Sequence, residues 1–264
     1  MTAPLQVERP RAGVARVVLG RPELRNAFDD VLVARLTEAF EALAADASVR
    51  VVVLAGAGKA FCAGADLGWM KRMVAYGAEE NRRDARALAA MFRAIDSCPK
   101  PVVGRIQGAA LGGGAGLVAV CDVAIAAEGT LLGTTEVRLG IVPAVISPFV
   151  VRKIGESHAR RWFLTGERFS AEEALRAGLV HAVVPEADLD AEVERTVDAL
   201  LLGGPEALAV SKELALRMGR VPLDEALDGA TGIIAARRAS AEGQEGMKAF
   251  LEKRDPSWTR RSGS

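Results

Sequence analysis

Hydrophobic residues follow two alternating patterns along the first two thirds of the chain. Four segments rich in apolar residues predict strands, at residues 14–19, 51–54, 101–106 and 123–126. The uninterrupted run 51–54 is typical of a strand buried on both faces of a sheet. Between them, residues 29–45 and 79–95 repeat apolar side chains at intervals of three and four, which predicts amphipathic helices. Asp29 or Asp30 is expected to cap the first of these helices. The alternation predicts an α/β protein.

The C-terminal third has a different pattern, because strand signals almost vanish from Ser147 onward. Helical spacing of apolar residues is found instead, at residues 158–164, 171–177, 189–201, 207–218, 223–241 and 245–252. We therefore expect residues 1–200 to form the α/β core and residues 201–264 to form a helical C-terminal subdomain.

Two glycine-bearing loops follow the predicted buried strands. Residues 107–116 hold five glycines directly after the apolar run 101–106, and residues 56–66 follow the run 51–54. Clustered glycines indicate a backbone that bends sharply or approaches another group closely. Free N–H groups at the start of the following helix bind an anion or a developing oxyanion. The cluster lacks the Gly-Lys-Ser/Thr ending of a nucleotide-binding P-loop, which favours the oxyanion interpretation.

Composition excludes several classes of function. The chain of 264 residues has 34 basic and 34 acidic side chains, so charge gives no reason to expect nucleic-acid or membrane partners. The cysteines, Cys62, Cys98 and Cys121, have no metal-binding spacing and fit a reduced compartment. With only His158 and His181, a histidine triad or multi-histidine metal site is nearly excluded. Without a secretory core or membrane-length apolar run, we expect a soluble cytoplasmic protein that binds no metal.

Three local motifs occur in an order and at a spacing that resemble the enoyl-CoA hydratase/isomerase (crotonase) superfamily. They are residues 60–67 (AFCAGADL), 108–116 (GAALGGGAG) and 135–143 (TEVRLGIVP), and the resemblance extends through residues 21–27, 164–174 and 245–254. It implies a spiral of ββα units and a helical C-terminal region that builds a trimer, usually within a dimer of trimers. It also implies an acyl-CoA thioester substrate, with no separate cofactor because coenzyme A is part of the substrate.

The resemblance also implies roles for particular residues. The backbone N–H groups of Ala65 and Gly113 would form an oxyanion hole for the thioester carbonyl oxygen, and Glu136 would be the principal catalytic carboxylate. Burial beside apolar residues is expected to raise the pKa of Glu136. Coenzyme A contacts are implied at Arg25, Ala27, Ala63, Asp66, Leu67, Phe250 and Lys253, the last two often from a neighbouring subunit.

One position departs from the familiar hydratases, which have a second glutamate three residues after the oxyanion glycine. That position is Gly116 in this chain. Either Glu136 performs both proton transfers of a hydration, or another group or an ordered water assists it. Some isomerases use a single carboxylate at the Glu136 position, so a Δ3,Δ2-enoyl-CoA isomerase is the alternative. An inactive CoA-binding paralogue and an RNA-binding protein are further alternatives, the latter opposed by the zero net charge.

A narrower resemblance favours hydration. Residues 135–152 look like the corresponding segment of bacterial methylglutaconyl-CoA and carboxygeranoyl-CoA hydratases, and Gly116 fits that branch. The resemblance implies a branched acyl chain with a second carboxylate at its distal end. An arginine binds a carboxylate well, and Arg138 and Arg152 are the candidates.

Other polar or reactive side chains are given structural roles. We expect Asp66 and Asp122 to cap helices or accept backbone hydrogen bonds, and Cys62 to be a small apolar filler. His158 is expected on the surface and His181 in a structural turn. The apolar cluster Trp69, Met70 and Met73 is expected in the core, or as a lining of the acyl pocket.

Overall fold

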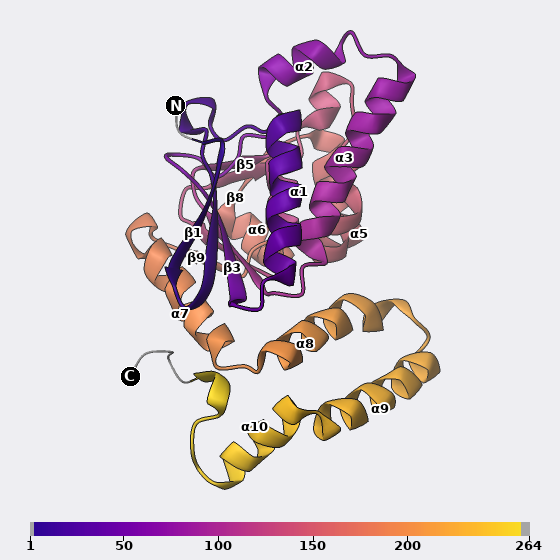
Figure 1. Ribbon diagram of the computed structural model, residues 1–264. Helices are drawn as coiled ribbons and strands as arrows, with labels where there is room; N and C mark the ends of the chain where they lie inside the picture. Colours follow the sequence, from indigo (N-terminus) through magenta and orange to yellow (C-terminus); the bar gives the residue numbers. More distant parts are fainter. Residues whose placement is uncertain (1–2, 260–264) are drawn as a thin grey trace.

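The computed structural model describes residues 3–259 and shows a central sheet with helices on both sides (Figure 1). The sheet has the strand order β1-β2-β3-β4-β6-β9. Its strands are β1 (Leu5–Arg11), β2 (Gly13–Leu19), β3 (Val49–Gly56), β4 (Val102–Ile106), β6 (Val123–Ala127) and β9 (Ala182–Val184). Every neighbouring pair is parallel except β1–β2, which is antiparallel. The four apolar runs are therefore strands of one sheet, as predicted.

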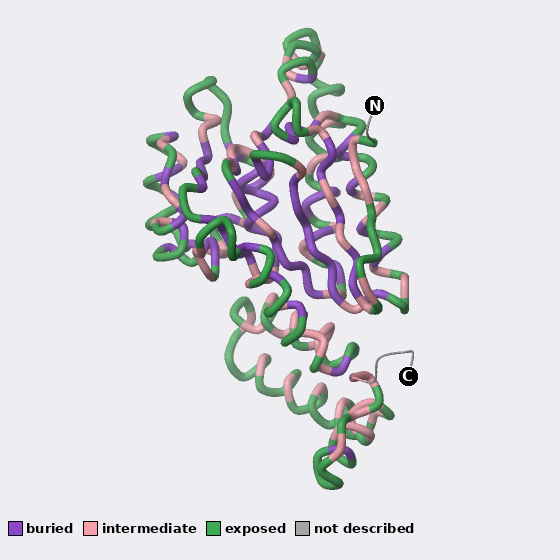
Figure 2. The backbone as a smooth tube through the Cα atoms, turned by 90° about the vertical axis from the view of Figure 1, so that its left-hand side faces the viewer, coloured by how far each residue is buried: buried purple, intermediate pink, exposed green. Residues whose placement is uncertain are grey.

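Burial on both faces of the sheet explains why residues 51–54 form an uninterrupted apolar run. Along β3, Val52 and Leu54 point into the larger core, beneath helices α1 (Asp30–Ala45) and α3 (Ala78–Asp96). Val51 and Val53 point to the other face, where α7 (Leu189–Leu201) packs. Figure 2 shows these strands as the most buried part of the chain. Alternate side chains of one strand thus enter two different cores.

A second, three-stranded sheet continues the alternation of strands and helices. It contains β5 (Ala109–Leu111), β7 (Leu131–Gly133) and β8 (Arg168–Ser170). The successive pairs β1–β2, β4–β5 and β6–β7 are each followed by a helix, which is α1, α4 (Gly113–Val120) or, after a 3-10 turn, α5 (Ser147–Thr165). This repetition is the ββα spiral that the sequence predicts. Helix α6 (Ala171–Ala177) follows β8.

The last three helices extend away from the sheets. They are α8 (Pro205–Arg217), α9 (Leu223–Ala239) and α10 (Ala241–Leu251), at the opposite end of the molecule from α2 (Leu67–Met73) (Figure 1). The side chain of Arg50 in β3 connects the sheet to both ends of this helical region. It donates hydrogen bonds to the carbonyl oxygens of Leu201, Gly203 and Trp258. The division between residues 1–200 and 201–264 stays a prediction.

Several elements differ from the sequence expectations. Strand β1 and helix α2 were not predicted, because β1 is a polar edge strand and α2 has only seven residues. Helix α5 begins at Ser147 rather than residue 158 and is interrupted at Gly155, whose φ is 71°. The helix expected over residues 223–241 ends at Ala239, because Ser240 adopts an extended conformation and its hydroxyl caps α10.

Candidate active site

The two glycine-bearing loops lie side by side at the carboxyl ends of β3 and β4. The Cys62 N–H donates to the Ala109 carbonyl at 3.0 Å, and the Leu111 N–H donates to the Cys62 carbonyl at 3.0 Å. A third segment joins them, since the Phe28 N–H donates to Gly64 and the Asp66 N–H donates to Phe28, both at 2.9 Å. Chain segments far apart in sequence are thereby fixed by backbone hydrogen bonds.

Glycine is required where these segments meet. A Cβ atom on Gly113 would lie 2.1 Å from Cζ of Phe28, and one on Gly114 would lie 2.2 Å from the Cys62 carbonyl oxygen. Gly64 has a φ of +95°, and its Cβ would lie 2.8 Å from the Leu111 carbonyl oxygen. No side chain fits at these distances without moving buried backbone or a buried ring.

The approach of the loops places two backbone N–H groups at one site. Gly64 packs on Gly112, so their successors Ala65 and Gly113 are near one another. Within residues 3–259, no acceptor binds the N–H of Ala65 or Gly113, whereas the Gly112 N–H donates to Gly133 at 2.8 Å. Gly113 is also the first residue of α4, where the helix dipole favours negative charge. The pair is thus available to an oxygen that gains negative charge.

The carboxylate of Glu136 lies next to this pair. Glu136 begins a 3-10 turn (Glu136–Leu139) shortly after β7, which the Gly112–Gly133 hydrogen bond ties to the loop. Oε1 would lie 3.4 Å from a Cβ on Gly112. Oε2 is buried and has no hydrogen-bond partner among the described residues. Burial raises the pKa of Glu136 above its usual value, as expected from the sequence.

Packing explains why residue 116 has no side chain. A Cβ on Gly116 would lie 2.3 Å from Cγ2 of Ile146 and 3.0 Å from Cε1 of Phe92, and both of these side chains are buried. Ile146 directly precedes α5. The isoleucine therefore fills the space that a side chain at position 116 would need.

The segment around Arg25 packs on the first loop. Arg25 has a left-handed φ of 51°, and its carbonyl accepts from the Ala63 N–H at 2.9 Å. Ala27 is buried beside it, and its carbonyl accepts from Arg21 at 2.9 Å. The structure thus brings Arg25, Ala27 and Ala63 together at the edge of the loop. Their contacts with coenzyme A stay predictions.

The chain matches the family model described as "Enoyl-CoA hydratase/isomerase" over residues 9–261. The chain belongs to this family. It is 43% identical to the solved structure of Pseudomonas aeruginosa AtuE, with a TM-score of 0.94, covering 98% of this chain and 100% of that one. An enoyl-CoA hydratase structure from Shewanella pealeana is 40% identical, with a TM-score of 0.92 and coverage of 97% and 96%. Enoyl-CoA hydratase AKT6-1 of Alternaria alternata is 39% identical over 209 residues, covering 77% of this chain and 67% of that protein.

These relatives confirm the crotonase-type α/β fold that the motifs predict. Asp66 caps α2 through the Trp69 N–H at 3.0 Å, as expected, and its other oxygen pairs with Arg21 at 3.1 Å. Its carboxylate is therefore already engaged by protein groups. Leu67, next to it, is 75% exposed.

Phe250 and Lys253 lie apart from the rest of the predicted family site. They stand at the end of α10, at the opposite end of the molecule from α2, and Phe250 is 83% exposed (Figure 1). A single chain therefore does not bring them to Glu136. The family resemblance expects them to reach the site of a neighbouring subunit.

The two arginine candidates for a distal carboxylate have different outcomes. The Arg152 guanidinium lies over the Phe149 ring, 5.6 Å from its centroid, and pairs with Asp96. The Phe149 ring in turn packs on Phe92, which contacts position 116. Arg152 is thus separated from position 116 by two aromatic rings, and its assignment to the acyl pocket is wrong. Arg138 is exposed and packs along Gly166.

The structural roles expected for other side chains are confirmed. Asp122 accepts from the Val102 N–H at 2.7 Å, and Nδ1 of His181 accepts from the Ala124 N–H at 3.0 Å. Burial raises the pKa of Cys62 to about 12, so its thiol stays protonated. Trp69 is buried against Phe28 in an edge-to-face contact, and His158 is exposed.

Two buried amides at the site were not predicted. Nδ2 of Asn26 donates to the carbonyls of Ala57 and Ala60, at 2.8 and 2.7 Å. Nε2 of Gln107 donates to the Gly56 carbonyl at 2.7 Å, which ties the second loop to the first. Each amide lies next to a loop or turn in the sequence. This position is the only feature from which its hydrogen bonds to the loop backbone could have been predicted.

Across residues 3–259, no cluster of three or more His, Cys, Asp or Glu side chains is arranged to hold a metal ion. None of the helices in the same range has the length and apolar character needed to cross a membrane.

Proposed function

We propose that this protein is an enoyl-CoA hydratase that adds water across the 2,3 double bond of a branched 2-enoyl-CoA. The thioester carbonyl oxygen would accept hydrogen bonds from the N–H groups of Ala65 and Gly113. These donors are fixed before the reaction, so they stabilise the enolate without reorganisation. The observation that supports the proposal most is the half-buried carboxylate of Glu136, with its buried and unpaired Oε2, beside this unpaired N–H pair.

Glu136 would perform both proton transfers. As a carboxylate it takes a proton from the water that attacks C3, and as a carboxylic acid it returns a proton to C2 of the enolate. A pKa raised by burial suits both steps, because the group must gain and lose a proton in each turnover. Gly116 and Ile146 leave no room for a carboxylate at position 116, which is why one residue is given both roles.

The acyl chain is proposed as branched from the resemblance of residues 135–152 to the methylglutaconyl-CoA and carboxygeranoyl-CoA hydratases. A distal carboxylate would lie near Arg138, the remaining candidate of the two. Incubation with 3-methylglutaconyl-CoA and with crotonyl-CoA, followed by loss of enoyl absorbance, tests the proposal. Turnover of neither ester, with binding of both intact, would exclude hydration.

The single carboxylate also favours a second candidate, a Δ3,Δ2-enoyl-CoA isomerase. Such an enzyme needs one group to carry a proton between two carbons, and Glu136 suffices. Product analysis in deuterated water separates the two reactions. Hydration adds an oxygen atom to the acyl chain, whereas isomerisation exchanges only hydrogen.

The pH dependence of the reaction is expected to report Glu136. The free enzyme needs an ionised base, so kcat/KM should fall as pH decreases through the pKa of this carboxyl. Because burial raises that pKa, the fall should occur above pH 4.5, the usual value for glutamate. A pH profile of kcat/KM, restricted to the range where circular dichroism shows a folded protein, measures it. An acid limb at or below the ordinary glutamate value would contradict the assignment.

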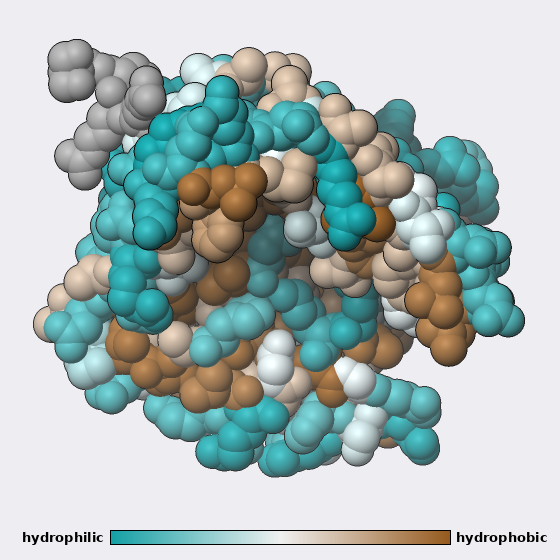
Figure 3. Space-filling view, turned by 90° about the horizontal axis from the view of Figure 1, so that it is seen from below, coloured by the Kyte–Doolittle hydropathy of each residue, from teal (hydrophilic) through white to brown (hydrophobic). Residues whose placement is uncertain are grey.

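We further propose that the protein works as a homotrimer or a dimer of trimers. Helix α9 has no buried residue, and large apolar side chains of the C-terminal helices are exposed. They include Leu223, Leu227, Ile234, Phe250 and Leu251. Figure 3, seen from the end with these helices, shows apolar patches beside a hollow. A second copy would cover such a surface.

Replacing Phe250 by Ala tests the proposed contribution of a neighbouring subunit. If Phe250 reaches coenzyme A in the adjacent site, F250A should raise KM for an enoyl-CoA several-fold and leave kcat nearly unchanged. Light scattering coupled to gel filtration establishes whether the variant keeps the oligomeric state of the wild type. Unchanged KM in an intact oligomer would remove Phe250 from the site.

A further inference from the structure

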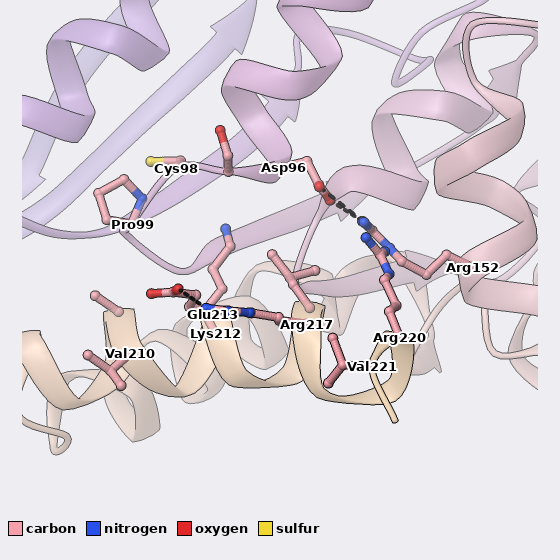
Figure 4. A pocket seen from close by; sticks show the side chains of 13 residues that line it. Asp96, Cys98, Pro99, Arg152, Val210, Lys212, Glu213, Arg217, Arg220 and Val221 are labelled. Carbon is pink, nitrogen blue, oxygen red and sulfur yellow. Dashed lines mark hydrogen bonds and ion pairs between the residues drawn. The ribbon is translucent and has the colours of Figure 1, made fainter. Parts of the chain in front are cut away.

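A second cavity lies between the core and the C-terminal helices, with a volume of about 510 Å³ (Figure 4). Its core wall consists of residues 96–99, which connect α3 to β4, and of Arg152 on α5. Its other wall is formed by α8 and the 3-10 turn Met218–Arg220 that follows it. This volume is within the range of small-molecule sites in proteins.

The cavity is separate from the candidate active site. Residues 96–99 precede β4, whereas the loop with Gly113 follows it. The five residues of β4 span about 15 Å at roughly 3.3 Å per residue. The cavity therefore lies at the amino ends of the parallel strands, and Glu136 lies toward their carboxyl ends.

Two of the four cations that line the cavity are already paired. Arg152 pairs with Asp96, and Nζ of Lys212 pairs with Asp122 at 2.7 Å. Asp122 also accepts the Val102 N–H at 2.7 Å, so this pair fixes α8 to the start of β4. The Lys212 side chain is only 8% exposed, and its charge is held at the wall.

The other two cations have little or no compensation. Arg217 has only Glu213 as a partner, at 3.7 Å on an exposed surface, where such pairs contribute little. Arg220 has no carboxylate partner among the described residues. Figure 4 shows Arg220 and Arg152 pointing toward one another from opposite walls. An anion between these guanidinium groups would offset their repulsion.

We propose that this cavity binds an organic phosphate, with the phosphate group held between Arg152 and Arg220. Guanidinium groups bind phosphate with paired hydrogen bonds, and a tetrahedral phosphate has enough terminal oxygens for donors from both walls. A carboxylate is planar and has only two oxygens, and the cavity is already lined by the carboxylate of Asp96. The rest of the ligand would lie against the apolar wall formed by Pro99, Val210, Leu216 and Val221.

Such a ligand would join two parts of the chain. Arg152 belongs to α5 of the core, whereas Arg220 lies in the turn that follows the C-terminal helix α8. Binding to both would therefore favour the docked position of α8, and would stabilise the folded protein increasingly as ligand concentration rises.

Calorimetric titration of the full-length protein at low ionic strength tests this proposal, with phenyl phosphate, inorganic phosphate and benzoate as probes. Phenyl phosphate should bind saturably and more tightly than inorganic phosphate, which lacks the apolar body. Benzoate, with the same ring and a carboxylate, should bind about tenfold more weakly or worse.

The variant R220A should weaken phenyl phosphate binding by about tenfold or more, as expected when a charge-assisted contact is lost. R160A is the matched control, because Arg160 is an exposed arginine on α5 outside the cavity. R220Q gives an independent test should R220A alter the melting temperature without ligand. Equal binding of benzoate, equal weakening by R160A, or no saturable binding would each overturn the proposal.

Discussion

Replacing Glu136 by Gln is expected to lower the turnover of an enoyl-CoA substrate by about 10²- to 10⁴-fold, the usual contribution of a positioned acid–base group. Glutamine has nearly the same shape, but its amide does not accept a proton from water near neutral pH. The N–H groups of Ala65 and Gly113 are unchanged by the substitution. The substrate should therefore still bind, and the dissociation constant of a non-reacting acyl-CoA measures this.

The stability of E136Q distinguishes chemistry from folding. Burial raises the pKa of Glu136, so its ionised form is less favourable in the folded state than in the unfolded state. The folded state then binds more protons, and the free energy of unfolding contributed by this group decreases as pH rises from 4.5 through the raised pKa. Removing the charge should leave the melting temperature at neutral pH unchanged or higher.

The control for this experiment is E128Q, since Glu128 is an exposed glutamate in the turn between β6 and β7. It should keep both turnover and melting temperature. Near-normal turnover by E136Q would show that another group moves the proton. A large loss of turnover in E128Q as well would point to a general effect of charge.

Replacing Gly113 by Ala is expected to damage the oxyanion site and the packing together. The new Cβ would be placed 2.1 Å from Cζ of Phe28, a fully buried ring that packs on Trp69. Overpacking of a core costs about 1–3 kcal/mol of stability. The backbone must move to relieve the clash, and loss of one oxyanion donor lowers kcat by about 10²- to 10³-fold.

Gly219→Ala is the control for this substitution. Gly219 lies in the 3-10 turn Met218–Arg220, where an added Cβ meets no atom within 4 Å. Alanine there should leave kcat unchanged and should not lower the melting temperature. The informative measurement is kcat for G113A below its melting temperature. Wild-type kcat in folded G113A would mean that the Gly113 N–H does not bind the reacting oxygen.

Much of the fold was predictable because its strands are buried on both faces. The run at residues 51–54 has no polar side chain, and a sheet covered on both faces accommodates such a sequence. Strand β1 escaped prediction for the opposite reason, since an edge strand needs no continuous apolar run. The extent of α5 was missed because Gly155 interrupts its helical pattern.

The candidate site was predicted from motifs, and the structure added the contacts between them. Residues 60–67 and 108–116 show which glycines matter, but the sequence does not contain the distances between loops. The close approach of Gly113 to Phe28, and of Gly116 to Ile146, depends on where α1 and α5 pack. For the same reason, no pattern in the sequence showed that Arg152 pairs with Asp96 and lies away from Glu136.

The sequence by itself determined the local elements and the family to which the chain belongs. The spacing of hydrophobic residues predicts strands and helices, and the positions of the glycines are known from the sequence alone. Tertiary structure decided which groups meet: the two glycine-bearing loops at Gly64 and Gly112, the buried oxygen of Glu136, and the arginine-lined cavity beside α8. The physical reason is that charge, pKa and steric fit depend on neighbours in space, and those neighbours are distant along the chain.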